Sequence, residues 1–115
     1  PQSVFRARLR GETIDLRAPP FVAARATWTD PADYGGCQAL ARQAREAGIA
    51  VLRYESVRDP QHAGCGAVLS VAAFAAAQPT ELQTWLLEVQ RDRVTWVPAS
   101  PLAGERFEFR FAAAA

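Results

Sequence analysis

Hydrophobic and polar residues alternate at the start of the chain, in the pattern of a β-strand with one solvent-facing side. Phe5, Ala7 and Leu9 fall on one side, and arginines separate them. A glycine-containing turn follows, and the extended pattern resumes at Thr13. The alternation predicts a β-hairpin over residues 4–16.

Residues 17–32 show no regular periodicity, and several prolines interrupt them. Each proline disfavours helix in the residue before it. Phe21, Val22 and Trp28 are large and apolar. We therefore expect an irregular loop that packs on the core.

A helix is predicted over residues 33–47. Asp30 or Asp33 can cap its first turn, and Gly48 is suited to end it. Its narrow apolar face suits close packing on a sheet. That face comprises Cys37, Leu40, Ala41, Ala44 and Ala47, and the opposite face comprises Gln38, Arg42, Gln43, Arg45 and Glu46.

Further short strands are predicted after the helix. Residues 49–54 form an apolar run that ends in polar groups, a loop is expected over 55–66, and 67–70 read as a short strand. The alanine-rich residues 71–77 suggest a helical turn. Proline at position 79 ends that turn.

The last third of the chain alternates again. Residues 81–89 and 94–97 flank a turn at 91–92 and predict a hairpin. A loop over 98–104 precedes a final strand at 106–111. In that strand we expect Phe107, Phe109 and Phe111 to face inward and Glu108 and Arg110 outward.

These elements predict an α+β domain over residues 1–115. We expect a mixed, mainly antiparallel sheet with one main helix against it. Hairpins at the margins would leave sheet edges open. We therefore also expect an obligate partner or self-association.

The composition is that of a globular protein, with 50% hydrophobic and 22% charged residues. No apolar run approaches the roughly 20 residues that span a membrane, and no signal peptide is recognisable. Cys37 and Cys65 lie in no metal-binding spacing, and we expect two buried thiols, with a disulfide as the alternative. Together these features predict a cytoplasmic protein without a metal site.

The charge pattern does not favour direct binding to nucleic acid. The net charge is +1, and the 13 basic residues, all arginine, are scattered along the chain. A nucleic-acid interface would rest on Arg6, Arg8, Arg91 and Arg93.

Candidate chemistry gathers where the 49–54 strand ends, because Ser56 and Arg58 follow Tyr54 there. A nucleophilic serine needs a base, and His62 is the one histidine of the chain, without a GxSxG motif around Ser56. We therefore interpret Ser56 as a hydrogen-bonding group for a ligand, with an ordinary turn serine as the alternative.

The neighbours of Ser56 suit an anionic, aromatic ligand. The fork of Arg58 fits a phosphate, with an ion pair to Asp59 or Glu55 as the alternative. Tyr54 can stack on a base or a nicotinamide, or else belong to the core. Arg53 points to the opposite strand face. Glu12, Glu46 and Glu55 are expected to be solvated, so no carboxylate pair is assigned.

Several runs together resemble the RES-domain family, the toxins of bacterial RES–Xre toxin–antitoxin pairs. The most specific is Tyr54-x-Ser56-Val-Arg58, and the resemblance covers about residues 1–98. The supporting runs are Asp33-Tyr34, Cys37–Leu40, Arg45–Ile49, Arg53–Pro60, Gly64–Val68 and the hairpin of Trp85–Val89 with Arg93-Val94.

The resemblance implies a fold similar to ADP-ribosyltransferases, with NAD as substrate and an Xre-type helix-turn-helix antitoxin as partner. Members hydrolyse NAD, cleave it with inorganic phosphate, or transfer ADP-ribose to a protein. By similarity, Ser56 is the family's catalytic serine, Arg58 touches phosphate, and Tyr54 completes the NAD contact.

The resemblance also implies an arginine and a glutamate upstream of the 4–16 segment. We therefore expect the chain to be the C-terminal part of a RES domain, and the absence of methionine agrees with this. A degenerate, non-enzymatic interaction domain and a small stand-alone domain are the alternatives.

Overall fold

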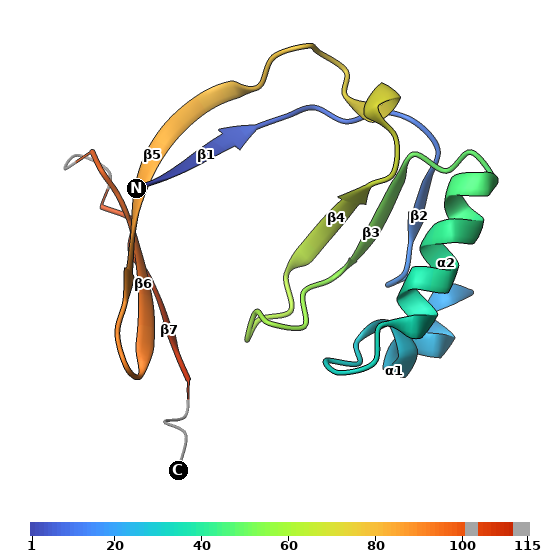
Figure 1. Cartoon of the computed structure of the whole chain (residues 1–115), viewed down its shortest axis with the longest axis horizontal. Coiled ribbons are helices and arrows are strands. Elements are labelled where there is room, and N and C mark those ends of the chain that lie inside the picture. Colours follow the sequence, from blue (N-terminus) through green and yellow to red (C-terminus); the bar gives the residue numbers. More distant parts are fainter. Residues whose placement is uncertain (101–103, 112–115) are drawn as a thin grey trace. The chain divides into compact units, whose positions relative to one another are not determined.

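The computed structural model describes residues 1–100 and 104–111, and the chain forms two compact units (Figure 1). One unit consists of residues 1–8 with 76–115, and the other of residues 9–75. In chain order the elements are β1 (Gln2–Arg6), β2 (Thr13–Asp15), η1 (Phe21–Ala24), α1 (Arg25–Trp28), α2 (Gly35–Glu46), β3 (Val51–Glu55), β4 (Gly64–Val68), η2 (Val71–Ala73), β5 (Thr80–Val89), β6 (Arg93–Pro98) and β7 (Phe107–Arg110).

A three-stranded sheet in the order β2-β3-β4 forms the centre of the 9–75 unit. Strands β2 and β3 are parallel, and β3 and β4 are antiparallel. The register places Leu52 between Ile14 and Ala67 on one face. Leu52, Leu16 and Ala44 of α2 are buried and form the core of this unit.

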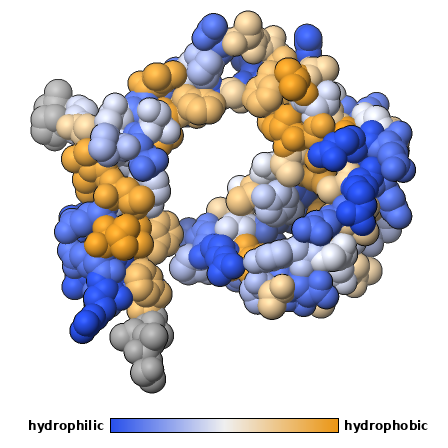
Figure 2. Space-filling view, viewed as in Figure 1, coloured by the Kyte–Doolittle hydropathy of each residue, from blue (hydrophilic) through white to orange (hydrophobic). Residues whose placement is uncertain are grey.

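The predicted helix is confirmed as α2, and two aspartates accept hydrogen bonds in the turn that leads into it. Asp33 Oδ1 accepts the N–H of Gly35, and Asp30 Oδ1 accepts the N–H groups of Ala32 and Asp33. Gly48 follows the helix with φ of +79°, which glycine adopts at little cost. The outer face of α2, at the right of Figure 2, is hydrophilic.

The other unit is an antiparallel sheet in the order β1-β5-β6-β7. The predicted hairpin is confirmed, because β5 and β6 pair and the Gln90 N–H donates to the Arg93 carbonyl at 2.8 Å. Trp85 is buried, and its ring centroid lies 5.9 Å from that of Phe107.

Within residues 1–100 and 104–111, four of the five strand pairs are antiparallel, which confirms the α+β class with mainly antiparallel pairing. The strands form two sheets, whereas one sheet was expected. The predicted strand at 49–54 is confirmed as β3, and the helical turn at 71–77 as η2. Strand β4 begins inside the predicted 55–66 loop, because Gly64 and Gly66 pair with β3 despite their low strand propensity.

The hairpin predicted over residues 4–16 is wrong. Strand β1 pairs with β5, and β2 pairs in parallel with β3. Alternation identifies a strand and its faces, but it carries no information on which strand is the partner. Strand β5 has ten residues and β2 has three, so β1 can form more backbone hydrogen bonds with β5 than it could with β2.

The irregular loop predicted over residues 17–32 is also partly wrong. It contains η1 and α1, and Val22 is exposed. Trp28 is half-buried, as expected of a packed residue, and its indole N–H donates to the Phe21 carbonyl at 2.8 Å.

The prediction that Phe107, Phe109 and Phe111 face inward is wrong, because all three are exposed. Their alternation is confirmed, since Phe107 lies opposite Trp96 and Phe109 opposite Val94. Among the described residues of this unit no helix covers the sheet face they share. In the loop predicted over 98–104, Pro98 belongs to β6, and residues 101–103 lie outside the described residues.

Candidate functional site

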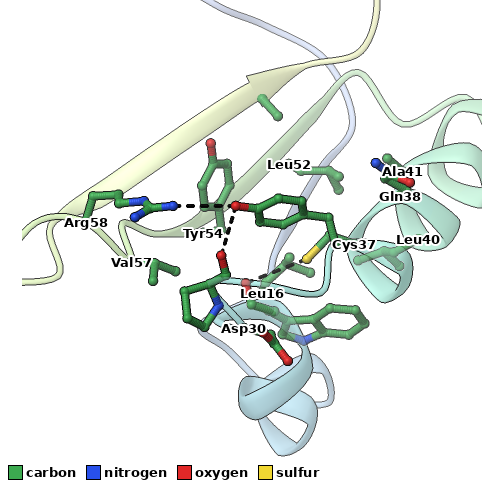
Figure 3. Close-up of a pocket in the computed structure, with 14 residues that line it drawn as sticks. Leu16, Asp30, Cys37, Gln38, Leu40, Ala41, Leu52, Tyr54, Val57 and Arg58 are labelled. Carbon is green, nitrogen blue, oxygen red and sulfur yellow. Dashed lines mark hydrogen bonds between the residues drawn. The ribbon is translucent and has the colours of Figure 1, made fainter.

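A cavity of about 400 Å³ lies between the helices and the central sheet of the 9–75 unit (Figure 3). Its volume falls within the range of small-molecule pockets. Its lining is mainly apolar and comes from both helices, β3 and the loop after β3. The lining residues are Leu16, Trp28, Asp30, Pro31, Tyr34, Cys37, Gln38, Leu40, Ala41, Leu52, Tyr54, Val57, Arg58 and Ala67.

Three aromatic side chains line this cavity, and two of them are fixed by hydrogen bonds. The Trp28 indole is held by the Phe21 carbonyl, and the Tyr34 hydroxyl donates to the Pro31 carbonyl at 3.0 Å. Tyr54 comes from β3, on the same strand face as the buried Leu52. Fixed rings of this kind can stack on a planar ligand.

Arg58 lies at the cavity with most of its donors available. Its Nη2 is 3.5 Å from the Tyr34 hydroxyl, which is a long contact (Figure 3). The alternative ion pair with Asp59 or Glu55 is not formed, and no carboxylate of residues 1–100 or 104–111 lies within 4 Å of the guanidinium. A phosphate or carboxylate ligand can therefore use the fork.

Asp30 is the carboxylate among the residues that line the cavity. The backbone N–H groups of Asp33 and Ala32 lower its pKa, so the group is ionised at neutral pH. The lining thus carries one cation and one anion. Asp30 was expected only as a helix cap, and the fold shows that the same turn borders a cavity.

Ser56 does not line the cavity with Tyr54 and Arg58. Its Oγ accepts the Asp59 N–H at 3.1 Å, so the side chain stabilises the turn after β3. The hydroxyl hydrogen remains available to a ligand, because a serine both donates and accepts. His62 Nδ1 lies 3.0 Å from the Ser56 carbonyl oxygen and 3.6 Å from Oε2 of Glu55, so neither contact involves the Ser56 hydroxyl.

Glu55 was expected to be solvated, and this is wrong. Its side chain is 16% exposed and makes two hydrogen bonds with Arg25 of α1. These bonds lower the pKa of Glu55, and the neighbouring His62 contributes a smaller electrostatic effect. The partner lies 30 residues away in the sequence, so no local pattern could reveal it.

The cysteines are two free, half-buried thiols, and the alternative of a disulfide is not formed. Cys37 lies at the cavity, and its thiol donates weakly to the carbonyls of Thr27 and Trp28 at 3.7 Å. Within the described part of the chain no three His, Cys, Asp or Glu side chains gather as metal ligands. In the same part, no helix is long and apolar enough to cross a membrane.

Comparison with known protein families gives a match. The family model of the RES domain matches residues 1–97, which is well over half of the chain. No curated protein matches the chain. The resemblance that rested on the Tyr54-x-Ser56-Val-Arg58 run is thereby confirmed at the level of the family.

Proposed function

The chain belongs to the RES domain family, and from this premise we propose that it consumes NAD as the toxin of a toxin–antitoxin pair. The family is associated with NAD-related toxin function. One observation carries the proposal to this chain: Tyr54 and Arg58, two residues of the run most specific to the family, line the same cavity.

The chemistry of the cavity matches that of NAD. Oxidised NAD carries a cationic nicotinamide ring and an anionic pyrophosphate, and the lining offers Asp30 and Arg58. The guanidinium fork suits two phosphate oxygens, and aromatic rings suit a planar base. At about 400 Å³ the cavity suits one nucleotide half of NAD rather than the entire molecule.

The proposed reaction breaks the bond between the nicotinamide nitrogen and the ribose. With water as acceptor the products are ADP-ribose, nicotinamide and a proton, and with inorganic phosphate they are ADP-ribose phosphate and nicotinamide. Ser56 is proposed as the catalytic serine that donates its hydroxyl to the substrate, while Asp59 holds its oxygen in place. Transfer of ADP-ribose to a protein is the third possible outcome.

The developing positive charge on the ribose requires a carboxylate close to it. We propose that the family's arginine and glutamate lie in sequence that precedes residue 1, so that this chain is the C-terminal part of a RES domain. A fold similar to ADP-ribosyltransferases, a cytoplasmic location and an Xre-type antitoxin as partner belong to the same proposal. Self-association is a further element of it.

One observation favours a second candidate, a non-enzymatic interaction domain. The Ser56 hydroxyl oxygen is already used within a turn, and Ser56 does not line the cavity. A RES fold that kept this turn for structural reasons would show the same contacts. The two candidates differ in whether Ser56 affects turnover.

Measurement of cellular NAD separates the two candidates. Expression of the full-length protein is expected to deplete NAD and arrest growth, and Ser56→Ala and Arg58→Ala are expected to relieve both effects. Arg42→Ala, on the exposed face of α2, is the matched control and should deplete NAD like the wild type. Unchanged NAD with a folded, full-length protein would rule out the enzymatic proposal.

A further inference from the structure

A second cavity, of about 390 Å³, lies in the same unit on the opposite face of the β2-β3-β4 sheet. Successive strand residues point to opposite faces, so Arg53 and Val51 line this cavity while Tyr54 and Leu52 line the first one. Arg10 reaches it from the segment before β2, and no carboxylate is among its lining residues.

Two glycines of β4 form part of its wall. Neither Gly64 nor Gly66 has a positive φ, so the backbone conformation does not require glycine at these positions. A Cβ at Gly64 would lie 2.7 Å from Nη1 of Arg17, so the missing side chain makes room for that guanidinium. A Cβ at Gly66 would approach nothing closer than the Leu52 carbonyl at 3.9 Å, so the space there is open.

The charge at this cavity is not balanced. Asp15 lies beside Arg53 in the β2–β3 register, and the Arg53 charge helps to lower its pKa, but Arg17 holds both of its oxygens at 2.9 and 2.8 Å. In the described ranges, Arg10 and Arg53 have no carboxylate within 4 Å. Two guanidinium groups on one concave surface attract an anion, and most strongly a doubly charged one.

We propose that this cavity binds the phosphate group of a small phosphorylated molecule, with Arg53 and Arg10 as the charged contacts. The glycine at position 66 lets the phosphate approach the strand backbone, because no side chain covers it. The concave shape favours a small molecule over nucleic acid, whose backbone needs a row of basic residues. The site does not depend on the proposed NAD chemistry, since the other sheet face carries that cavity.

The test uses pyrophosphate as the probe, in calorimetric titrations of the chain. Arg53→Gln is expected to weaken binding by about tenfold or more, since one charge-assisted contact is lost. Arg42→Gln removes an exposed arginine of α2 and should bind like the wild type. The amide signals of Gly11, Gly64 and Gly66 in NMR spectra should shift during the titration.

A second variant tests the site without a change of charge. Gly66→Val fills the open space with a residue suited to strands, and it should abolish binding while thermal unfolding shows a folded protein. Equal affinity for pyrophosphate and ADP would assign recognition to the phosphates alone, and tighter binding of ADP would assign it to a nucleotide.

Three results would overturn the proposal. These are wild-type affinity in folded Gly66→Val, unchanged amide signals of Gly11, Gly64 and Gly66, and tighter binding of a short duplex DNA than of pyrophosphate. Because NAD turnover is not the readout, failure here leaves the proposed function standing, and success does not support it.

Discussion

Arg25 and Glu55 form a two-point ion pair that connects α1 to the end of β3. The Nε donates to Oε1 at 2.6 Å and the Nη2 to Oε2 at 3.0 Å. Trp28 follows three residues after Arg25, and Tyr54 directly precedes Glu55. Both aromatic residues line the first cavity, so the ion pair holds two of its walls together.

This pair predicts a pH-dependent contribution to stability. Hydrogen bonds from Arg25 lower the pKa of Glu55 from its ordinary value of 4.5, so the folded state binds its proton less readily than the unfolded chain. The stabilisation is therefore present above pH 4.5 and is lost as the pH falls through the lowered pKa. Urea unfolding at a series of pH values should show Glu55→Gln less stable than wild type at neutral pH, with a difference that shrinks in acid. A difference that stays constant with pH would contradict the role of this ion pair.

The packing of the 9–75 unit predicts a large effect at Leu52. The side chain is 5% exposed, so Leu52→Ala should lower the free energy of unfolding by about 2–5 kcal/mol. Leu82→Ala is the matched control, because Leu82 is 67% exposed and should change stability by less than about 0.5 kcal/mol. Equilibrium unfolding of both variants measures the contrast, and equal effects would show that Leu52 is not a core residue.

Features with a local signal could be predicted from the sequence. Helix α2 follows from its apolar spacing, its aspartates and Gly48, and the β5–β6 hairpin follows from alternation about a two-residue turn. The pairing of β1 with β5 could not be predicted, because it joins Gln2 to Trp85 across most of the chain. Strand periodicity determines the face of a residue and leaves its partner open.

The same distinction applies to the candidate site. The sequence identified Tyr54 and Arg58 because an apolar strand leads directly to them, and they lie together at one cavity. Trp28 and Asp30 come from a segment without periodicity, so only the fold could bring them to that cavity. The alternative for Ser56 was an ordinary turn serine. The hydrogen bond from the Asp59 N–H to Ser56 Oγ shows that the serine stabilises the turn while its hydroxyl hydrogen stays available to a ligand.

Substitution of Ser56 should separate its structural role from its chemical role. Ser56→Ala removes the acceptor of the Asp59 N–H, which should cost about 1 kcal/mol of stability. On the proposed function it also removes the donor to substrate and should slow NAD consumption by about a hundredfold. Ser56→Thr keeps the hydroxyl and should retain most of the stability and most of the NAD consumption. NAD consumption and thermal unfolding measured on the same samples would count against a chemical role if Ser56→Ala lost stability alone.

Arg58 should determine the affinity for NAD rather than the stability of the fold. The side chain is exposed and its closest protein contact is the 3.5 Å approach to Tyr34, so Arg58→Ala should leave unfolding within about 0.5 kcal/mol of wild type. The loss of a charge-assisted phosphate contact should weaken NAD binding by about tenfold or more. Arg58→Lys keeps the charge without the planar fork, and its affinity for NAD should fall between those of wild type and Arg58→Ala. An ammonium group cannot bind two oxygens in the bidentate geometry of a guanidinium. Titration of NAD into the three proteins, with Arg42→Ala as control, gives the order of affinities. If Arg58→Ala and Arg42→Ala bound NAD equally well, the phosphate contact would have to come from another residue, and the orientation proposed for NAD in this cavity would be wrong.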